Sequence, residues 1–292
     1  MGHSSERLTL TIGDMSEHHR RVHEYAGRDP RGVATGGAEG HELPAAVRVA
    51  LWATLVLGGR LRVEELPRRA LPDIDECDGL KEAVELWAGL GERVVLAALP
   101  RPGDLTGLPH GTPEMVQAAL TAEECVYVPG IGGVLVPTLG TFGPEGDQGW
   151  LARWTAYPAD PVPTHRIEAL DLGHVERTLR TELAEVTAQL VRAGGLPVGP
   201  SADHGLARAR AARSGAGSWG IPDGLPPRAL RVIDLAATVL ALTEAGLDPA
   251  LESVDATSTT RRSALLRRLR DLALTALADG TNAAALHLAF RS

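Results

Sequence analysis

Lysine is almost missing from this sequence, because 28 of its 29 basic residues are arginine and only Lys81 is lysine. Together with abundant Ala, Gly, Leu and Val, this usage is typical of a bacterial genome of high GC content. The arginine content is therefore no sign of nucleic-acid binding. The net charge of −8 favours the same interpretation, because an acidic protein repels a phosphate backbone.

Cysteine and long apolar runs are also scarce. Cys77 and Cys125 are the two cysteines, and neither belongs to a C-x-x-C pair, so the sequence has no disulfide framework. We therefore expect the protein in a reducing cytoplasm. The longest apolar runs, residues 49–58 and 235–242, are too short for a membrane-spanning helix of roughly 20 residues, so we expect no membrane association.

Aromatic residues make up 3% of the chain, and half of them lie in residues 124–157. Alternating segments separated by glycine turns predict a three-stranded antiparallel meander there, with strands at 124–129, 134–142 and 150–157. Trp150 and Trp154 share one face of the third strand, spaced by alanines. We expect both indoles to be largely buried under the helix predicted at 173–190 or under its successors.

Helical periodicity is present on both sides of the meander. The predicted helices are residues 43–57, 80–90, 113–122, 173–193, 228–245 and 260–278, with a separate tail helix at 283–290 after Asp279 and Gly280. Asp78 is expected to cap the helix at 80–90, and Asp171 the helix at 173–193. Further short strands are expected at 7–12, 61–66, 94–99 and 166–170.

These elements predict an α+β fold, with an N-terminal mixed sheet that ends in the antiparallel three-stranded meander and is followed by a C-terminal helical part. The predicted organisation is a polar segment over residues 1–40, an α+β domain over 41–160 and a mainly helical region over 161–292. An irregular loop rich in glycine and proline occupies residues 195–227 of that region.

Three short patterns resemble ligand sites but fail in their context. His19 and His23 could share a helix face, yet no third metal ligand is near in sequence. A calcium loop counted from Asp73 fails at three positions, because Cys77 and Asp78 stand where a carboxylate and a glycine are needed, and Val84 stands in place of the final glutamate. The glycines in 130–133 lead into a strand, so they fit a hairpin better than a phosphate cradle. The sequence therefore predicts no metal and no cofactor.

The loop at 195–227 carries the residue types of a catalytic triad, Ser201, Asp203 and His204. Triads are assembled from distant positions, so neighbours in sequence are weak support. A flexible loop anchored by Trp219 is the favoured interpretation. A small-molecule enzyme with its site between the meander and this loop is the alternative, and its candidate residues are Trp150, Arg153, Asp203 and His204.

A dense basic cluster lies on the predicted helix at 260–278 and comprises Arg261, Arg262, Arg267, Arg268 and Arg270. It could hold phosphates, so a nucleic-acid contact through 261–270 is a second alternative. Four carboxylates precede the cluster in residues 244–255, and no aromatics are interleaved for base stacking. A solvated or salt-bridged face is therefore favoured, and a nucleic-acid partner is not expected.

The failed site patterns and the apolar terminal helices favour a non-catalytic binding or scaffolding protein that works in the cytoplasm and self-associates into a homo-oligomer. The sequence identifies no small-molecule ligand. The candidate binding residues are Trp150, Trp154, Trp219, Arg261, Arg262, Arg267 and Arg268.

Overall fold

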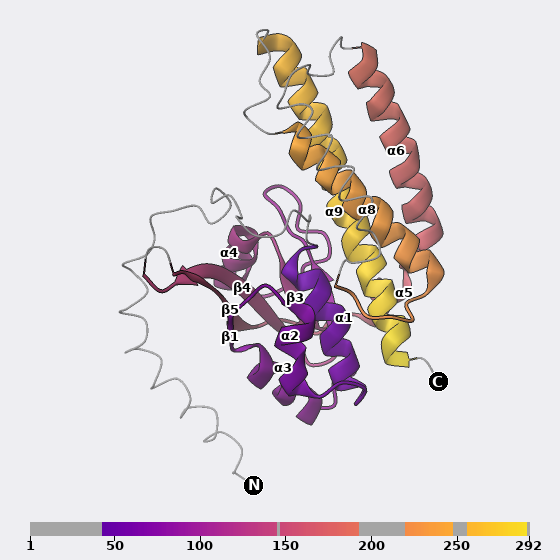
Figure 1. Cartoon of the computed structure of the whole chain (residues 1–292). Coiled ribbons are helices and arrows are strands. Elements are labelled where there is room, and N and C mark those ends of the chain that lie inside the picture. Colours follow the sequence, from indigo (N-terminus) through magenta and orange to yellow (C-terminus); the bar gives the residue numbers. More distant parts are fainter. Residues whose placement is uncertain (1–42, 145–146, 193–219, 248–255, 291–292) are drawn as a thin grey trace. The chain divides into compact units, whose positions relative to one another are not determined.

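The N-terminal half of the chain builds a five-stranded mixed sheet (Figure 1). The computed structural model describes residues 43–144, 147–192, 220–247 and 256–290, all within the unit Glu39–Ser292. The strand order is β1 (Glu76–Asp78), β5 (Gly149–Pro158), β4 (Gly133–Phe142), β3 (Cys125–Val128) and β2 (Leu96–Ala98). Strands β2 to β5 pair antiparallel, and β1 pairs parallel to β5. The predicted α+β class and the meander are confirmed.

Helices precede, interrupt and follow the sheet in sequence. Those of the first half are α1 (Ala45–Leu57), the 3-10 turn η2 (Val63–Glu65), α2 (Leu66–Ala70), α3 (Leu80–Gly89) and α4 (Pro113–Ala122). Those of the second half are α5 (Thr164–Glu168), α6 (Leu172–Arg192), α8 (Pro227–Gly246) and α9 (Ala256–Phe290). Helices α8 and α9 pack along each other, and α6 lies beside them (Figure 1).

The two faces of the sheet are buried in two different hydrophobic cores. Successive side chains of a strand point to opposite faces of the sheet. Leu135 therefore lies in a core with residues of α1, α2 and α3, whereas its neighbours Val134 and Val136 lie in a core with residues of α4, α6, α8 and α9. The second core contains residues from both sides of residue 160, such as Tyr127 and Ile233. The domain boundary predicted near residue 160 stays a prediction.

Trp154 is buried, as expected, but the predicted partner helix was wrong. Its side chain is 3% exposed and lies in the core that α1, α2 and α3 build, whereas α6 packs on α8 and α9. Trp154 lies under these helices because of β1, a short strand that was not predicted. Strand β1 pairs with β5 and leads directly into α3, whose N-cap Gly79 lies against the Trp154 carbonyl. Trp150 is only half-buried.

Other local predictions were also corrected. Residues 61–66 enter a 3-10 turn and α2, and residues 166–170 overlap α5, so neither forms the predicted strand. Asp78 does not cap α3, because it belongs to β1 and its side chain lies 3.6 Å from Arg153. Asp171 does cap α6, where its Oδ1 accepts hydrogen bonds from the backbone N–H groups of Gly173 and His174. The strand predicted at 7–12 lies outside the described residues.

Helix α9 continues through Asp279 and Gly280, where the sequence analysis predicted a break. A Cβ at Gly280 would lie 3.1 Å from Val232 and 3.2 Å from Ile233 of α8. The glycine thus allows close approach of two helices, and it does not end one. This close contact is why a residue that usually signals a helix end stands inside the longest described helix.

Asn282 of α9 closes the β2 edge of the sheet. The Ala97 N–H donates to its Oδ1 at 2.7 Å, and its Nδ2 donates to the Ala97 carbonyl at 3.0 Å. One buried side-chain amide therefore replaces the neighbouring strand that an edge residue lacks. The pair also fixes the position of α9 along β2.

We expect Asn282→Ala to lower the free energy of unfolding by about 3 kcal/mol, because it leaves the buried Ala97 N–H and carbonyl without partners. Urea denaturation followed by circular dichroism measures this loss. The control is His287→Ala on the exposed side of the same helix, which should change stability by less than about 0.5 kcal/mol. Equal stability of the two variants would contradict the structural role of Asn282.

Candidate functional site

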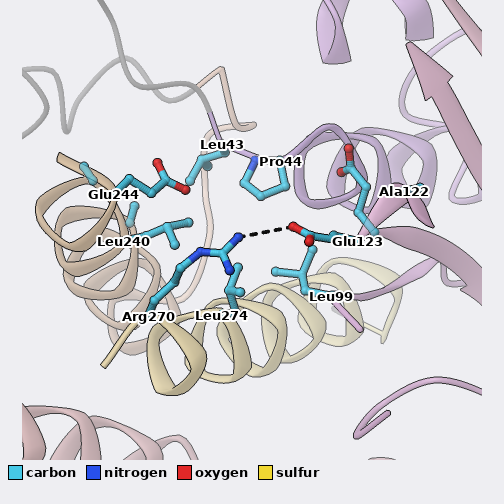
Figure 2. Close-up of a pocket in the computed structure, with 12 residues that line it drawn as sticks. Leu43, Pro44, Leu99, Ala122, Glu123, Leu240, Glu244, Arg270 and Leu274 are labelled. Atoms are coloured by element: carbon cyan, nitrogen blue, oxygen red, sulfur yellow. Dashed lines mark hydrogen bonds and ion pairs between the residues drawn. The ribbon is translucent and has the colours of Figure 1, made fainter. Parts of the chain in front are cut away.

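A small pocket lies where the start of α1, the α4–β3 junction, α8 and α9 meet (Figure 2). Its volume is about 220 Å³. Ligand sites for drug-sized molecules are usually larger, roughly 300–1,000 Å³. Its polar side chains are Glu123, Glu124, Glu244 and Arg270, and the rest of its lining is aliphatic. None of the three glutamates was predicted as a site residue, because the elements that bring them together are far apart in the chain.

Glu124 holds the first turn of α1. Its Oε2 accepts a hydrogen bond of 2.7 Å from the backbone N–H of Ala46. The N-cap residue of this helix, Pro44, provides no side-chain cap, so the glutamate satisfies an N–H that would otherwise lack a partner. Burial raises the pKa of Glu124 to about 7, although the Ala46 hydrogen bond and the charge of Arg48 oppose the shift. The carboxyl therefore exists in both protonation states near neutral pH.

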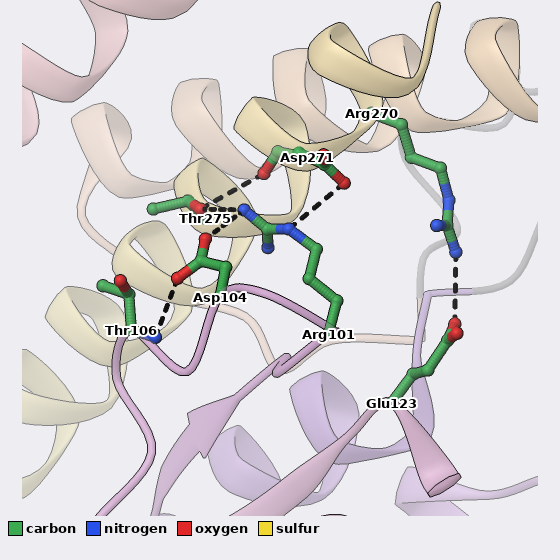
Figure 3. A network of polar contacts seen from close by, with 7 residues as sticks. All are labelled: Arg101, Asp104, Thr106, Glu123, Arg270, Asp271 and Thr275. Carbon is green, nitrogen blue, oxygen red and sulfur yellow. Dashed lines mark hydrogen bonds and ion pairs between the residues drawn. The ribbon is translucent and has the colours of Figure 1, made fainter. Parts of the chain in front are cut away.

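Glu123 and Arg270 link the meander to α9. Glu123 follows α4 with a left-handed backbone, at a φ of 58°, and this residue turns the chain from the helix into β3. Its Oε2 lies 3.2 Å from Nη2 of Arg270, and both side chains are partly buried (Figures 2 and 3). The ion pair forms one wall of the pocket.

A second polar network around Arg101 ties the loop after β2 to α9 (Figure 3). The guanidinium pairs with Asp104 and with Asp271, whose Oδ1 is 3.1 Å from Nε, and it donates to the Thr275 hydroxyl at 3.1 Å. Hydrogen bonds from Thr106, with a smaller contribution from Arg101, hold the pKa of Asp104 below its usual range. Because each of these groups has a partner within the chain, the network is structural.

The basic cluster predicted on the helix at 260–278 does not form one surface. Arg268 pairs with Glu182 of α6 at 2.7 Å, Arg262 donates to the Gly246 carbonyl at 2.9 Å, and Arg270 faces the pocket. Arg261 and Arg267 are exposed. The arginines have different surroundings because neighbouring residues of a helix point in different directions around its axis. A role in binding stays a prediction for all of them.

The enzyme site predicted between the meander and the loop at 195–227 is described only on its meander side. Arg153 is exposed on β5 beside Asp78, and Trp150 is half-buried. Ser201, Asp203, His204 and Trp219 lie outside the described residues, as do His19 and His23. Convergence of these residues with Arg153 therefore stays a prediction.

Two kinds of reactive group outside the pocket have shifted pKa values: burial raises the pKa of the Asp279 carboxyl on α9 to about 6, and it also raises the pKa of both cysteine thiols. Burial raises the pKa of the Cys77 thiol to about 11 and also raises that of Cys125, so neither thiol is favoured as a nucleophile. Within the described ranges, no group of three or more His, Cys, Asp or Glu side chains is placed to hold a metal ion. In the same part of the chain, no helix is long and apolar enough to cross a membrane.

We expect Glu124→Gln to be more stable than the wild-type protein at alkaline pH and similar to it at acid pH. The pKa of Glu124 is raised above 4.5 on folding, so its contribution to stability is complete below that value and is lost as the pH rises through about 7. The difference in unfolding free energy should grow by on the order of 2 kcal/mol from about pH 5 to about pH 8, allowing for solvent screening.

Urea denaturation across this pH range measures the effect. The control is Glu85→Gln, which removes one negative charge from the exposed side of α3. A stability difference between Glu124→Gln and wild type that does not change with pH would contradict the burial of this carboxyl.

Comparison with known proteins places the chain in a family. No curated protein and no solved structure matches it at a significant level. The family model described as Rv1486c-like protein, N-terminal domain, matches residues 46–169, and the model described as Rv1486c-like protein, C-terminal domain, matches residues 173–278. The two models follow each other along the sequence and together span most of it, so the chain belongs to the Rv1486c-like family.

Proposed function

We propose that this chain is a non-catalytic binding or scaffolding protein that self-associates through the outer half of its β4–β5 hairpin. The observation that carries the proposal is the edge of β4 at residues 138–142, which pairs with no strand among the described residues and carries the exposed side chains of Leu139 and Phe142. We also propose a cytoplasmic location, because Cys77 and Cys125 are both free thiols, which suits a reducing compartment.

The hairpin extends beyond its neighbours in the sheet. Strands β4 and β5 pair over their whole length, from Gly133 opposite Pro158 to Phe142 opposite Gly149. In contrast, β3 pairs only with residues 133–135 of β4, and β1 only with residues 151–153 of β5. Among the described residues, no strand pairs with the other edge of β4 from Val136 onward.

Pro137 shows which backbone groups face this edge. In an antiparallel pair, alternate residues direct both N–H and carbonyl to the partner strand. Pro137 lacks an N–H, so it belongs to the set that points away from β5. Leu139 and Thr141 belong to the same set, and their N–H and carbonyl groups therefore point to the unpaired edge. Such an edge is a template for pairing with another strand.

The side chains of this segment favour a second copy of the chain as the partner. Leu139 and Phe142 are each 37% exposed, and the space beside Gly140 is open. Residues 137–142 carry no charge, so two such edges can approach each other although the whole chain has a net charge of −8. An antiparallel pair centred on Gly140 places Leu139 opposite Thr141 of the second copy, which is a closed twofold arrangement.

We expect the wild-type chain to be a dimer at micromolar concentration, and Leu139→Lys to be a monomer, because a charge on the edge opposes strand pairing. Thr141→Pro should have the same effect by removing an outward N–H. Sedimentation velocity or light scattering measures the mass. The control is Leu86→Lys on α3, which charges a leucine that is 61% exposed elsewhere. A wild-type monomer into the high micromolar range would refute the proposed self-association.

A further inference from the structure

We propose that four arginines near the N-terminal ends of α6 and α8 bind an acidic segment of a partner protein. The four are Arg177 and Arg180 of α6 and Arg228 and Arg231 of α8. This arginine surface is separate from the β4–β5 edge, and its role does not depend on the proposed self-association. Four properties support it: the position of the guanidiniums, their excess of charge, their hydrogen-bond donors and the open shape of the surface.

The arginines gather because α6 and α8 begin side by side and run in the same direction (Figure 1). Arg228 reaches Gly173 at the start of α6. Arg231, one turn later on α8, reaches Glu176, one turn later on α6. A Cβ at Gly173 would lie 3.3 Å from Nη1 of Arg177 and 3.3 Å from Nη2 of Arg228. Guanidiniums of the two helices therefore approach the same point.

The arginine surface has an excess of positive charge. Among the described residues, two carboxylates lie against its four guanidiniums. Glu176 is between 3.0 and 4.0 Å from three of them, and Asp171 lies beside the fourth at the start of α6. Glu182, farther along α6, is paired with Arg268 of α9 at 2.7 Å. Guanidiniums this close repel one another, and the carboxylates of a partner would reduce that repulsion.

Most hydrogen-bond donors of this surface have no acceptor among the described residues. A guanidinium carries five N–H donors. Arg180 donates to Glu176 at 3.0 Å. Arg228 and Arg231 lie 3.9 and 4.0 Å from the same carboxylate, which are ion-pair distances and too long for hydrogen bonds. Arg177 likewise donates no hydrogen bond to a described residue. These planar donors match the two oxygens of a carboxylate.

The open shape of the surface favours a protein segment over a small anion. The side chains of Arg180, Arg228 and Arg231 are 61%, 57% and 55% exposed, and none of them lines the pocket at the start of α1. A small anion would bury little area there, whereas a segment with several carboxylates can pair with several guanidiniums at once. Neither α6 nor α8 contains an aromatic residue on which a nucleic-acid base could stack.

Fluorescence anisotropy of a labelled hexaglutamate peptide, titrated with the full chain, tests the proposal. We expect a dissociation constant of about 100 μM at about 50 mM salt. Binding should be lost at about 1 M salt, because salt screens charges on an open surface. The hexaglutamine peptide has the same length without the charge and should not bind.

A double variant assigns the binding to this surface. Arg177→Gln combined with Arg228→Gln removes the two guanidiniums that approach Gly173, and it should weaken binding about tenfold. The control combines Arg62→Gln with Arg68→Gln, which makes the same change of charge at exposed arginines next to or within α2. The control should bind like wild type.

Removing the carboxylate inside the surface should have the opposite effect. Glu176→Gln takes a competing negative charge away from three guanidiniums, so it should strengthen binding about threefold. Glu185→Gln makes the same change of charge at an exposed position on the same helix and should bind like wild type. A purely structural role of these ion pairs gives no such gain. Circular dichroism checks that each variant is folded.

Several results would each overturn the proposal. They are no binding of hexaglutamate at low salt, equal binding of hexaglutamine, unchanged affinity in the arginine double variant, and weaker binding by Glu176→Gln. Displacement of the peptide by an equal concentration of inorganic phosphate would overturn it, since the surface would then serve a small anion. Tighter binding of a labelled oligothymidine would overturn it in favour of nucleic acid. None of these outcomes bears on the oligomeric state, so the proposed self-association succeeds or fails by its own measurement.

Discussion

The hydrogen bonds between Asn282 and Ala97 are the constraint on which the rest of the C-terminal half depends. They fix the register of α9 against the edge strand β2. The same side of α9 then presents Asp271 and Thr275 to Arg101, and Arg270 to Glu123. Gly280 allows α8 to lie close to α9, and the ion pair between Arg268 and Glu182 links α6 to α9. One long helix therefore positions its two companion helices and one wall of the pocket.

Much of the architecture could be predicted because local sequence determines it. The 3.6-residue periodicity gave α1, α3, α4, α6 and α8 within a few residues, and the glycine turns gave the meander. The failures were non-local. Strand β1 has three residues and forms only because β5, some 70 residues later, lies beside it. Gly280 indicates a helix end in sequence, and only the packing of α8 reveals its actual role.

The pocket could not be predicted for a related reason. Two adjacent glutamates at the end of a helix are ordinary in sequence, and Glu124 becomes unusual only after α1 and the C-terminal helices bury it. Arg270 was recognised as one member of a basic run, yet its neighbours in that run have different partners. Residue type predicts which groups can ionise, whereas burial and partners determine the pKa at which they do so.

The pocket and the open edge of β4 have a common structural origin in the turn at Glu123. If the pairing of β3 with β4 continued, Glu124 would lie opposite Pro137. The residues that precede Glu124 in sequence would then pair with the rest of β4. Instead α4 occupies those residues, and the left-handed backbone of Glu123 starts β3 only at Cys125. The turn directs Glu123 and Glu124 to α9 and α1, and it leaves residues 137–142 without a neighbouring strand. Pro137, which has no N–H to offer a neighbour, stands where the β3 pairing stops. The shortness of β3 thus shapes the pocket and leaves this part of β4 without a neighbouring strand.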